Sequence, residues 1–77
     1  MRGADALVPA IARLEAAGVE GAARDARVLL AHALGIATDR LTLHLPDAMT
    51  EPQTAAYEAA IVAREARQPV AQITGRR

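Results

Sequence analysis

Residues 21–35 read Gly-Ala-Ala-Arg-Asp-Ala-Arg-Val-Leu-Leu-Ala-His-Ala-Leu-Gly and contain the strongest helix signal in the chain. Its larger apolar residues recur at intervals of three and four, which places them on one side of an α-helix. The charged and imidazole side chains lie mostly off that side, and a glycine such as Gly35 commonly ends a helix. We therefore expect an amphipathic helix over residues 21–34. Its apolar stripe consists of Ala22, Ala26, Leu29, Leu30, Ala33 and Leu34.

The segment that precedes Gly18 is predicted to be a first helix. We expect it to begin within residues 4–8, so that Pro9 falls early, in the first turn, where a missing N–H costs little. Gly18 is a plausible left-handed residue at its end. The residues that recur at helical spacing here are Leu7, Ile11 and Leu14.

A short third helix is expected after Gly35. Thr38 or Asp39 can cap its start with a side-chain oxygen. The helix would run to about His44, with Leu41 and Leu45 facing inward, and the Pro-Asp pair that follows would break it.

Helix four has the clearest start signal in the chain. Thr50 can accept a hydrogen bond from the backbone three residues on, and Gln53 can reach back to the backbone of Thr50. Pro52 is tolerated because first-turn N–H groups have no partner to lose. The helix is expected to extend to about Arg67, with one side formed by Tyr57, Ala60, Ile61 and Arg64.

The chain ends in a last short turn between Pro69 and Gly75, where Val70 and Ile73 are the residues expected to be buried. No segment alternates polar and apolar residues with a period of two, as a half-buried strand would. The predicted fold class is therefore all-α, a small bundle of about five short helices without a sheet.

Composition excludes several classes of protein. Apolar residues make up 52% of the chain, but alanine dominates them and Tyr57 is the one aromatic residue, so the core is expected to be thin. Nine basic and nine acidic residues are interleaved and give no field that would attract nucleic acid. Cysteine is absent, which excludes disulfides and thiolate metal sites. With no signal-peptide pattern and no membrane-length apolar run, we expect a soluble, cytoplasmic protein.

The polar residues suggest no catalytic, cofactor-binding or metal site. His32 and His44 lie twelve residues apart on different elements without companion ligands, so we interpret them as surface or capping residues. Asp25 with Arg24 and Arg27 is interpreted as a set of solvated pairs on an exposed helix face. Serine is absent, and the glycines are dispersed at helix ends instead of forming a phosphate-binding turn.

The C-terminal quarter is locally basic through Arg64, Arg67, Arg76 and Arg77, with Glu65 as the one acidic residue among them. Three interpretations stay open. The arginines can bind an acidic partner or RNA through planar bidentate bonds. They can form the solvated flank of helix four, with their stems covering apolar surface. They can also pack against whatever follows Arg77.

Three stretches together resemble one family, the HemK/PrmC-type methyltransferases that modify peptide chain release factors. Residues 24–35 resemble the second helix of that family, and residues 41–47 resemble its following short helix and loop. Residues 64–77 resemble the segment that joins its helical N-terminal domain to its catalytic domain, although Gln68 stands where the family more often has an acidic residue. The resemblance covers about residues 5–77.

The resemblance implies that substrate recognition and catalysis belong to two different domains. Family members join a helical N-terminal bundle to a Rossmann-like domain that binds S-adenosylmethionine and carries an Asn-Pro-Pro-Tyr motif. They methylate the glutamine of the Gly-Gly-Gln loop in class 1 release factors, and the bundle helps to position that substrate. By this resemblance residues 1–75 are a substrate-recognition domain and residues 76–77 begin the linker.

Neither the Gly-rich cofactor turn nor the Asn-Pro-Pro-Tyr motif occurs in this chain, so it cannot itself catalyse methyl transfer. S-adenosylmethionine is expected in the missing catalytic domain. The expected partners are a class 1 release factor and the chain's own catalytic domain, with the chain as a monomer that contacts neither nucleic acid nor membrane. The candidate partner-contact residues are Arg64, Arg67 and Gln68.

Two alternatives remain. A stand-alone helical interaction module without enzymatic activity would have the same fold and composition. A helix-turn-helix nucleic-acid binder is disfavoured by the zero net charge and by the lack of a helix whose exposed face is rich in Arg, Asn and Gln.

Overall fold

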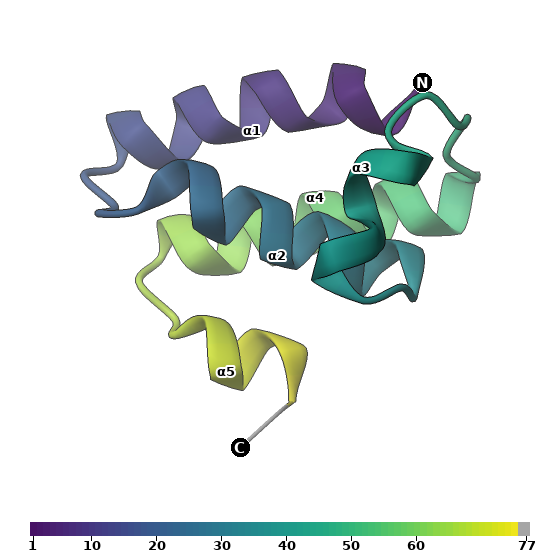
Figure 1. Ribbon diagram of the computed structural model, residues 1–77. Helices are drawn as coiled ribbons and strands as arrows, with labels where there is room; N and C mark the ends of the chain where they lie inside the picture. Colours follow the sequence, from purple (N-terminus) through teal and green to yellow (C-terminus); the bar gives the residue numbers. More distant parts are fainter. Residues whose placement is uncertain (76–77) are drawn as a thin grey trace.

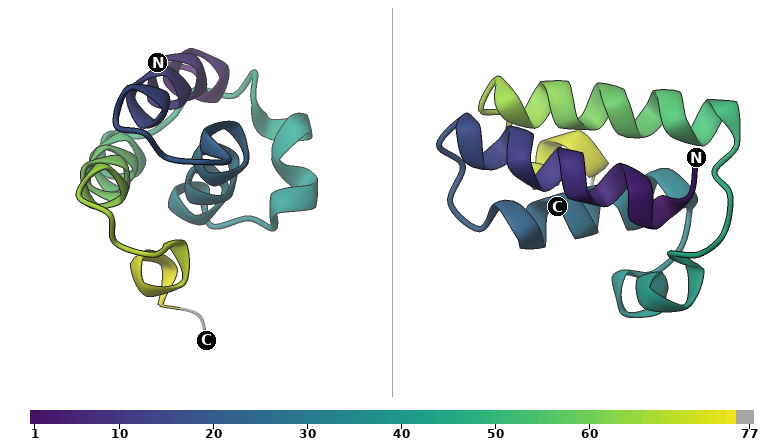
Figure 2. Two further views of the ribbon diagram at one scale, coloured as in Figure 1. Left: turned by 90° about the vertical axis from the view of Figure 1, so that its left-hand side faces the viewer. Right: turned by 90° about the horizontal axis from the view of Figure 1, so that it is seen from above.

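The computed structural model describes residues 1–75 and shows five α-helices and one 3-10 turn in that range, with no strand. Helix α2, Ala22–Leu34, lies at the centre with the other helices around it (Figures 1 and 2). Gly35 ends α2 with a φ of 73°, as expected of a left-handed C-terminal residue. The all-α class and the helix count predicted from the sequence are confirmed for this part of the chain.

Helix α1, Gly3–Ala16, begins earlier than predicted. Its first N–H groups are satisfied by a distant loop, because Gly3 N–H donates to the Asp47 carbonyl at 3.2 Å and Ala4 N–H to the Leu45 carbonyl at 2.9 Å. The early start moves Pro9 from the expected first turn into the helix interior, so that prediction was wrong. An interior proline removes a helix hydrogen bond, at a cost of about 3 kcal/mol in an isolated helix.

The segment after α2 forms a 3-10 turn, Thr38–Arg40, followed by the one-turn helix α3, Leu41–His44. Ala37 occupies the N-cap position and no side chain caps the turn, so the predicted capping role of Thr38 or Asp39 is not found. The backbone makes the bond instead, since Arg40 N–H donates to the Ala37 carbonyl at 3.0 Å. Leu41 is fully buried, as predicted, whereas Leu45 is half-buried.

Helix α4, Glu51–Glu65, has the predicted start. Gln53 N–H donates to Thr50 Oγ1 at 3.2 Å, and Thr50 N–H donates to Gln53 Oε1 at 2.9 Å. Tyr57 and Ile61 are buried on the side that faces α1 and α2. A turn that contains Pro69 leads to helix α5, Val70–Thr74. The residues expected to be buried there, Val70 and Ile73, are only partly buried against the core.

The core lies where α1, α2 and α4 meet, with α3 closing one side (Figure 2). Its largest fully buried side chains are aliphatic: Leu14, Leu29, Leu30, Leu41 and Ile61. Alanines fill the remaining space between the helices and allow them to approach closely, as expected from a composition with one aromatic residue. Within residues 1–75 no helix is long and apolar enough to cross a bilayer.

Candidate functional site

The three predicted contact residues all lie around the C-terminal end of α4, where the chain turns toward α5. Arg64 is the most covered of them, with 20% of its side chain exposed. Its Nε–H donates to Asp25 Oδ2 at 3.1 Å, and its Nη1–H donates to the Gln68 carbonyl at 3.1 Å. The guanidinium of Arg64 is therefore bonded within the chain, between α2 and the turn that follows α4.

Asp25 is buried, with 3% of the residue exposed, which corrects its assignment to a solvated surface pair. Arg24 does lie near it, at 3.5 Å and largely exposed, but the closer partner of Asp25 is Arg64. A carboxylate removed from water is costly unless a cation and hydrogen bonds compensate. Helix α4 supplies that cation here, 39 residues further along the chain.

Arg67 closes the C-terminal end of α1. Its Nη2–H donates to the Ala17 carbonyl at 2.8 Å, and Nη1 lies 3.5 Å from the Gly18 carbonyl. A cation is favourable there because the last carbonyls of a helix lack partners and carry partial negative charge. Arg67 also has a φ of 73°, a left-handed conformation that costs a non-glycine residue roughly 1 kcal/mol. The surrounding contacts therefore hold Arg67 in a strained position.

Gln68, the third predicted contact residue, is exposed beside this turn. Its backbone N–H donates to the Ala63 carbonyl at 3.1 Å, so the backbone of Gln68 is fixed at both its N–H and its carbonyl. Arg76 and Arg77, the other members of the basic cluster, lie outside the described residues. The structure thus brings Arg64 and Arg67 together with Gln68 at one turn.

Sequence reasoning missed a second cluster of charges, between α1 and α4. Arg13 Nη1 lies 2.7 Å from Glu58 Oε1, and Arg13 Nη2 lies 2.8 Å from Glu65 Oε1. The bonds to Glu58 and then to Glu65 raise the pKa of Arg13, and the bond from Arg13 lowers the pKa of Glu58. Among the described residues, Glu65 therefore pairs with Arg13 and not with Arg64 or Arg67, its basic neighbours in sequence. The seven-residue spacing of the two glutamates, which places them on one helix face, was the available signal.

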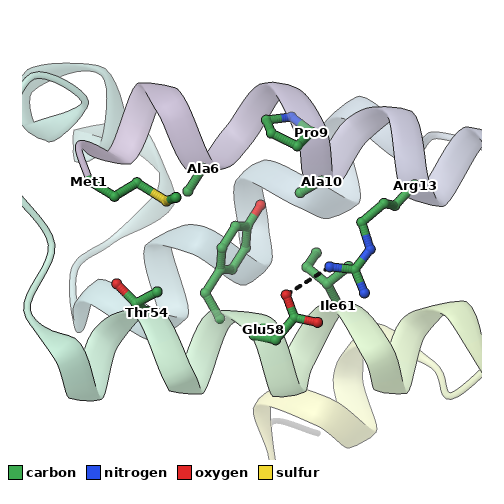
Figure 3. A pocket seen from close by; sticks show the side chains of 9 residues that line it. Met1, Ala6, Pro9, Ala10, Arg13, Thr54, Glu58 and Ile61 are labelled. Atoms are coloured by element: carbon green, nitrogen blue, oxygen red, sulfur yellow. Dashed lines mark hydrogen bonds and ion pairs between the residues drawn. The ribbon is translucent and has the colours of Figure 1, made fainter.

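A shallow apolar groove runs between α1 and α4 beside these charges (Figure 3). Its volume is about 140 Å³. The ring of Tyr57 forms part of its wall, and the Tyr57 hydroxyl donates to the Ala26 carbonyl of α2 at 2.9 Å. Burial raises the pKa of this phenol. The other residues along the groove include Met1, Ala6, Pro9, Ala10 and Ile61.

The imidazoles and carboxylates of residues 1–75 include no group of three or more that could hold a metal ion. His44 Nδ1 lies 3.0 Å from Asp47 Oδ2, and His32 is exposed on α2. Within the described range every buried side-chain nitrogen and oxygen has a hydrogen-bond partner. Among the described residues, hydrogen bonds from three arginine side chains join one helix to another or to the end of a helix.

Comparison with known proteins places these helices in a known family. Residues 5–75 match the family model described as the PrmC N-terminal domain. A release factor glutamine methyltransferase of Cereibacter sphaeroides is 61% identical over 77 residues, which is all of this chain and 28% of that protein. A release factor glutamine methyltransferase of Rhodospirillum rubrum is 43% identical over 65 residues, 84% of this chain and 20% of that protein.

The chain thus spans between a fifth and little more than a quarter of the length of the relatives that it matches. No solved structure gave a significant match. The family model nevertheless extends over almost all of the described residues, from the first turn of α1 to the glycine that ends α5. The chain therefore belongs to the PrmC N-terminal domain family.

Proposed function

We propose that residues 1–75 form the substrate-recognition domain of an S-adenosylmethionine-dependent protein-glutamine methyltransferase that acts on the Gly-Gly-Gln loop of class 1 release factors. The observation that carries this proposal is the 61% identity, over the full 77 residues, to a protein named release factor glutamine methyltransferase. Neither relative supports the alternative of a free-standing interaction module, because both are named as methyltransferases. Residues 76–77 would begin the linker to the catalytic domain.

The cofactor would bind outside this chain. S-adenosylmethionine sites of the Rossmann type need a strand followed by a Gly-rich turn and a helix N-terminus. Residues 1–75 contain no strand, and four of their five glycines have a positive φ between helices or at helix ends. This domain would therefore contribute binding and orientation, and the methyl donor would be held by the domain that follows.

Recognition by a separate domain has a physical rationale. An amide nitrogen is a weak nucleophile, so it must be held in line with the methyl group that it attacks. Binding energy from parts of the substrate remote from the reacting atoms can be converted into that positioning. A rigid helical bundle linked to the catalytic domain would make a second contact with the same substrate. It would thereby raise the effective concentration of the Gly-Gly-Gln loop at the catalytic domain.

We place the contact with the release factor at the end of α4, where Arg67 and Gln68 are exposed. A guanidinium has five N–H donors, so Arg67 keeps donors for a partner beyond those that bond to Ala17 and Gly18. Arg64 contributes from behind, by fixing the Gln68 carbonyl. The partner would be a class 1 release factor bound by a monomer of this protein.

The test compares two substrates of the full-length protein. Deletion of residues 1–75 should lower kcat/KM for intact release factor far more than for a short Gly-Gly-Gln peptide, because the peptide does not reach the bundle. Arg67→Ala with Gln68→Ala should reproduce part of this selective loss. Arg40→Ala is the matched control, since Arg40 is an exposed arginine on the 3-10 turn, away from the end of α4 (Figure 1). Equal losses on both substrates would overturn the proposal.

A further inference from the structure

Helix α5 is short and makes few stabilising interactions within itself. It contains five residues, none of them buried, and Pro69 at its N-cap makes no side-chain cap. Val70 and Ile73 are only partly buried against the core. Helices this short are not stable alone in water. Helix α5 lies against α2 and α4, and the turn that precedes it is the second feature that fixes the direction in which the chain leaves the bundle.

That turn is held by hydrogen bonds from arginine side chains. Arg64 donates to the Gln68 carbonyl at 3.1 Å, and Arg67 donates to the Ala17 carbonyl at the end of α1 at 2.8 Å. The left-handed backbone of Arg67 is an additional indication, because such strain persists only where the surroundings determine the conformation. We call Asp25, Arg64, Arg67 and Gln68 together the α4–α5 joint.

Asp25 connects this joint to the centre of the bundle. It lies in the first part of α2, with 5% of its side chain exposed, and accepts from Arg64 Nε at 3.1 Å. A guanidinium is planar and rigid, so the position of its Nε constrains the position of its Nη1. The carboxylate of α2 thereby determines where Arg64 can hold the backbone of Gln68.

We propose that Asp25 is a positioning residue that acts through Arg64 to fix the orientation of α5, and of the domain that follows α5, relative to the bundle. This inference rests on the proposed function for its link to methyl transfer. Its structural half, the claim that Asp25 and Arg64 fix the orientation of α5, concerns this chain alone. Because Asp25 is buried, it cannot act by touching the release factor.

The first experiment measures backbone order by ¹⁵N relaxation in the 77-residue chain. Arg64→Lys keeps a cation beside Asp25, but a single ammonium group cannot reproduce the rigid pair of donors. We expect amide order parameters in α5 of about 0.85 in the parent chain and below about 0.6 in Arg64→Lys, with α1, α2 and α4 unchanged. Arg24→Ala is the matched control, because it removes the exposed partner of the same carboxylate.

Each outcome of that experiment is decisive. Rigid α5 amides in Arg64→Lys would overturn the proposal, and so would an equal loss of order in Arg24→Ala. The proposal is supported if Arg64→Lys loses backbone order only in α5 and Arg24→Ala loses none. The relaxation experiment leaves the buried Asp25 unchanged, so Arg64→Lys decides the structural part of the proposal even where the variant Asp25→Asn, used in the second experiment, does not fold.

The second experiment tests the consequence for methyl transfer in the full-length protein. Arg64→Lys and Asp25→Asn should each lower kcat/KM for intact release factor by roughly tenfold to a hundredfold, and leave kcat/KM for a Gly-Gly-Gln peptide unchanged. Equal losses on both substrates would overturn the positioning role. If the parent protein methylates no release factor while the α5 amides still lose order in Arg64→Lys, the proposed function fails and the structural role of the α4–α5 joint is supported. If the parent protein methylates release factor while the α5 amides stay rigid in Arg64→Lys, the proposed function holds and the inference about the α4–α5 joint fails.

Discussion

Replacement of Tyr57 by phenylalanine should lower the free energy of unfolding by about 1 kcal/mol at neutral pH. Tyr57 is 4% exposed, and its hydroxyl donates to the Ala26 carbonyl at 2.9 Å. That carbonyl lies within α2 and keeps its own helix hydrogen bond, so the substitution leaves no buried group without a partner. In a domain of this size the loss corresponds to a fall in Tm of about 4–8 °C. Urea unfolding followed by circular dichroism measures it.

The same substitution should remove the alkaline instability of the protein. Burial raises the pKa of Tyr57 in the folded state, whereas the unfolded phenol ionises near pH 10 or so. The stability contributed by the neutral phenol is complete below that pH and is lost as pH rises toward the folded pKa. Lysine is absent, so Tyr57 is the side chain that titrates in this range.

The difference in stability between the parent and Tyr57→Phe should therefore depend on pH. At neutral pH the parent is the more stable, and the difference between the two proteins should shrink as pH rises above about 10. The phenolate absorbance of the parent reports the folded pKa directly, because Tyr57 is the one aromatic residue. A difference in stability that stays constant through the alkaline range, or a phenol that titrates at its ordinary pKa in the folded protein, would refute the reasoning.

Two further substitutions test the helix start and the charge cluster. Thr50→Ala removes the oxygen that accepts from Gln53 N–H and should lower the free energy of unfolding by about 1 kcal/mol, while Thr50→Ser should restore most of it; urea unfolding of the three proteins checks this. Glu58→Gln should reduce the loss of stability that the protein shows as pH falls below about 4.5. The reason is that Arg13 lowers the pKa of Glu58, so the stability from this pair is present above about pH 4.5 and is lost as pH falls further. Thermal unfolding across acid pH measures this, and an unchanged loss of stability at acid pH would contradict it.

Local sequence was sufficient for the helices whose ends are set by their own residues. The start of α4 was predicted because Thr50 and Gln53 bond to each other three residues apart. The end of α2 was predicted because Gly35 can adopt a left-handed conformation. The start of α1 was missed because its first N–H groups bond to residues 45–47, which no local pattern connects to the N-terminus.

The candidate site shows the same limit. Arg64 and Arg67 were singled out by their charge, but their partners lie 39 and 50 residues away in the chain. Asp25 was assigned to the surface because its neighbours are arginines. Its spacing from Ala22 and Leu29, three residues before and four after, placed it on the buried side and was the signal to follow. What could not be predicted was that α4 would bring Arg64 to it.

The bonds at the N-terminus bear on the order in which the protein can fold during synthesis. Residues 1–4 are synthesised before residues 45–49, yet their hydrogen bonds lead to Leu45, Asp47 and Met49, the last through Met49 N–H to the Met1 carbonyl at 2.8 Å. Until that loop has left the ribosome, the first turn of α1 is open to water and its amides have no partner in the chain. The first turn of α1 is thus completed late, and the bundle closes as one unit after most of its sequence has been translated.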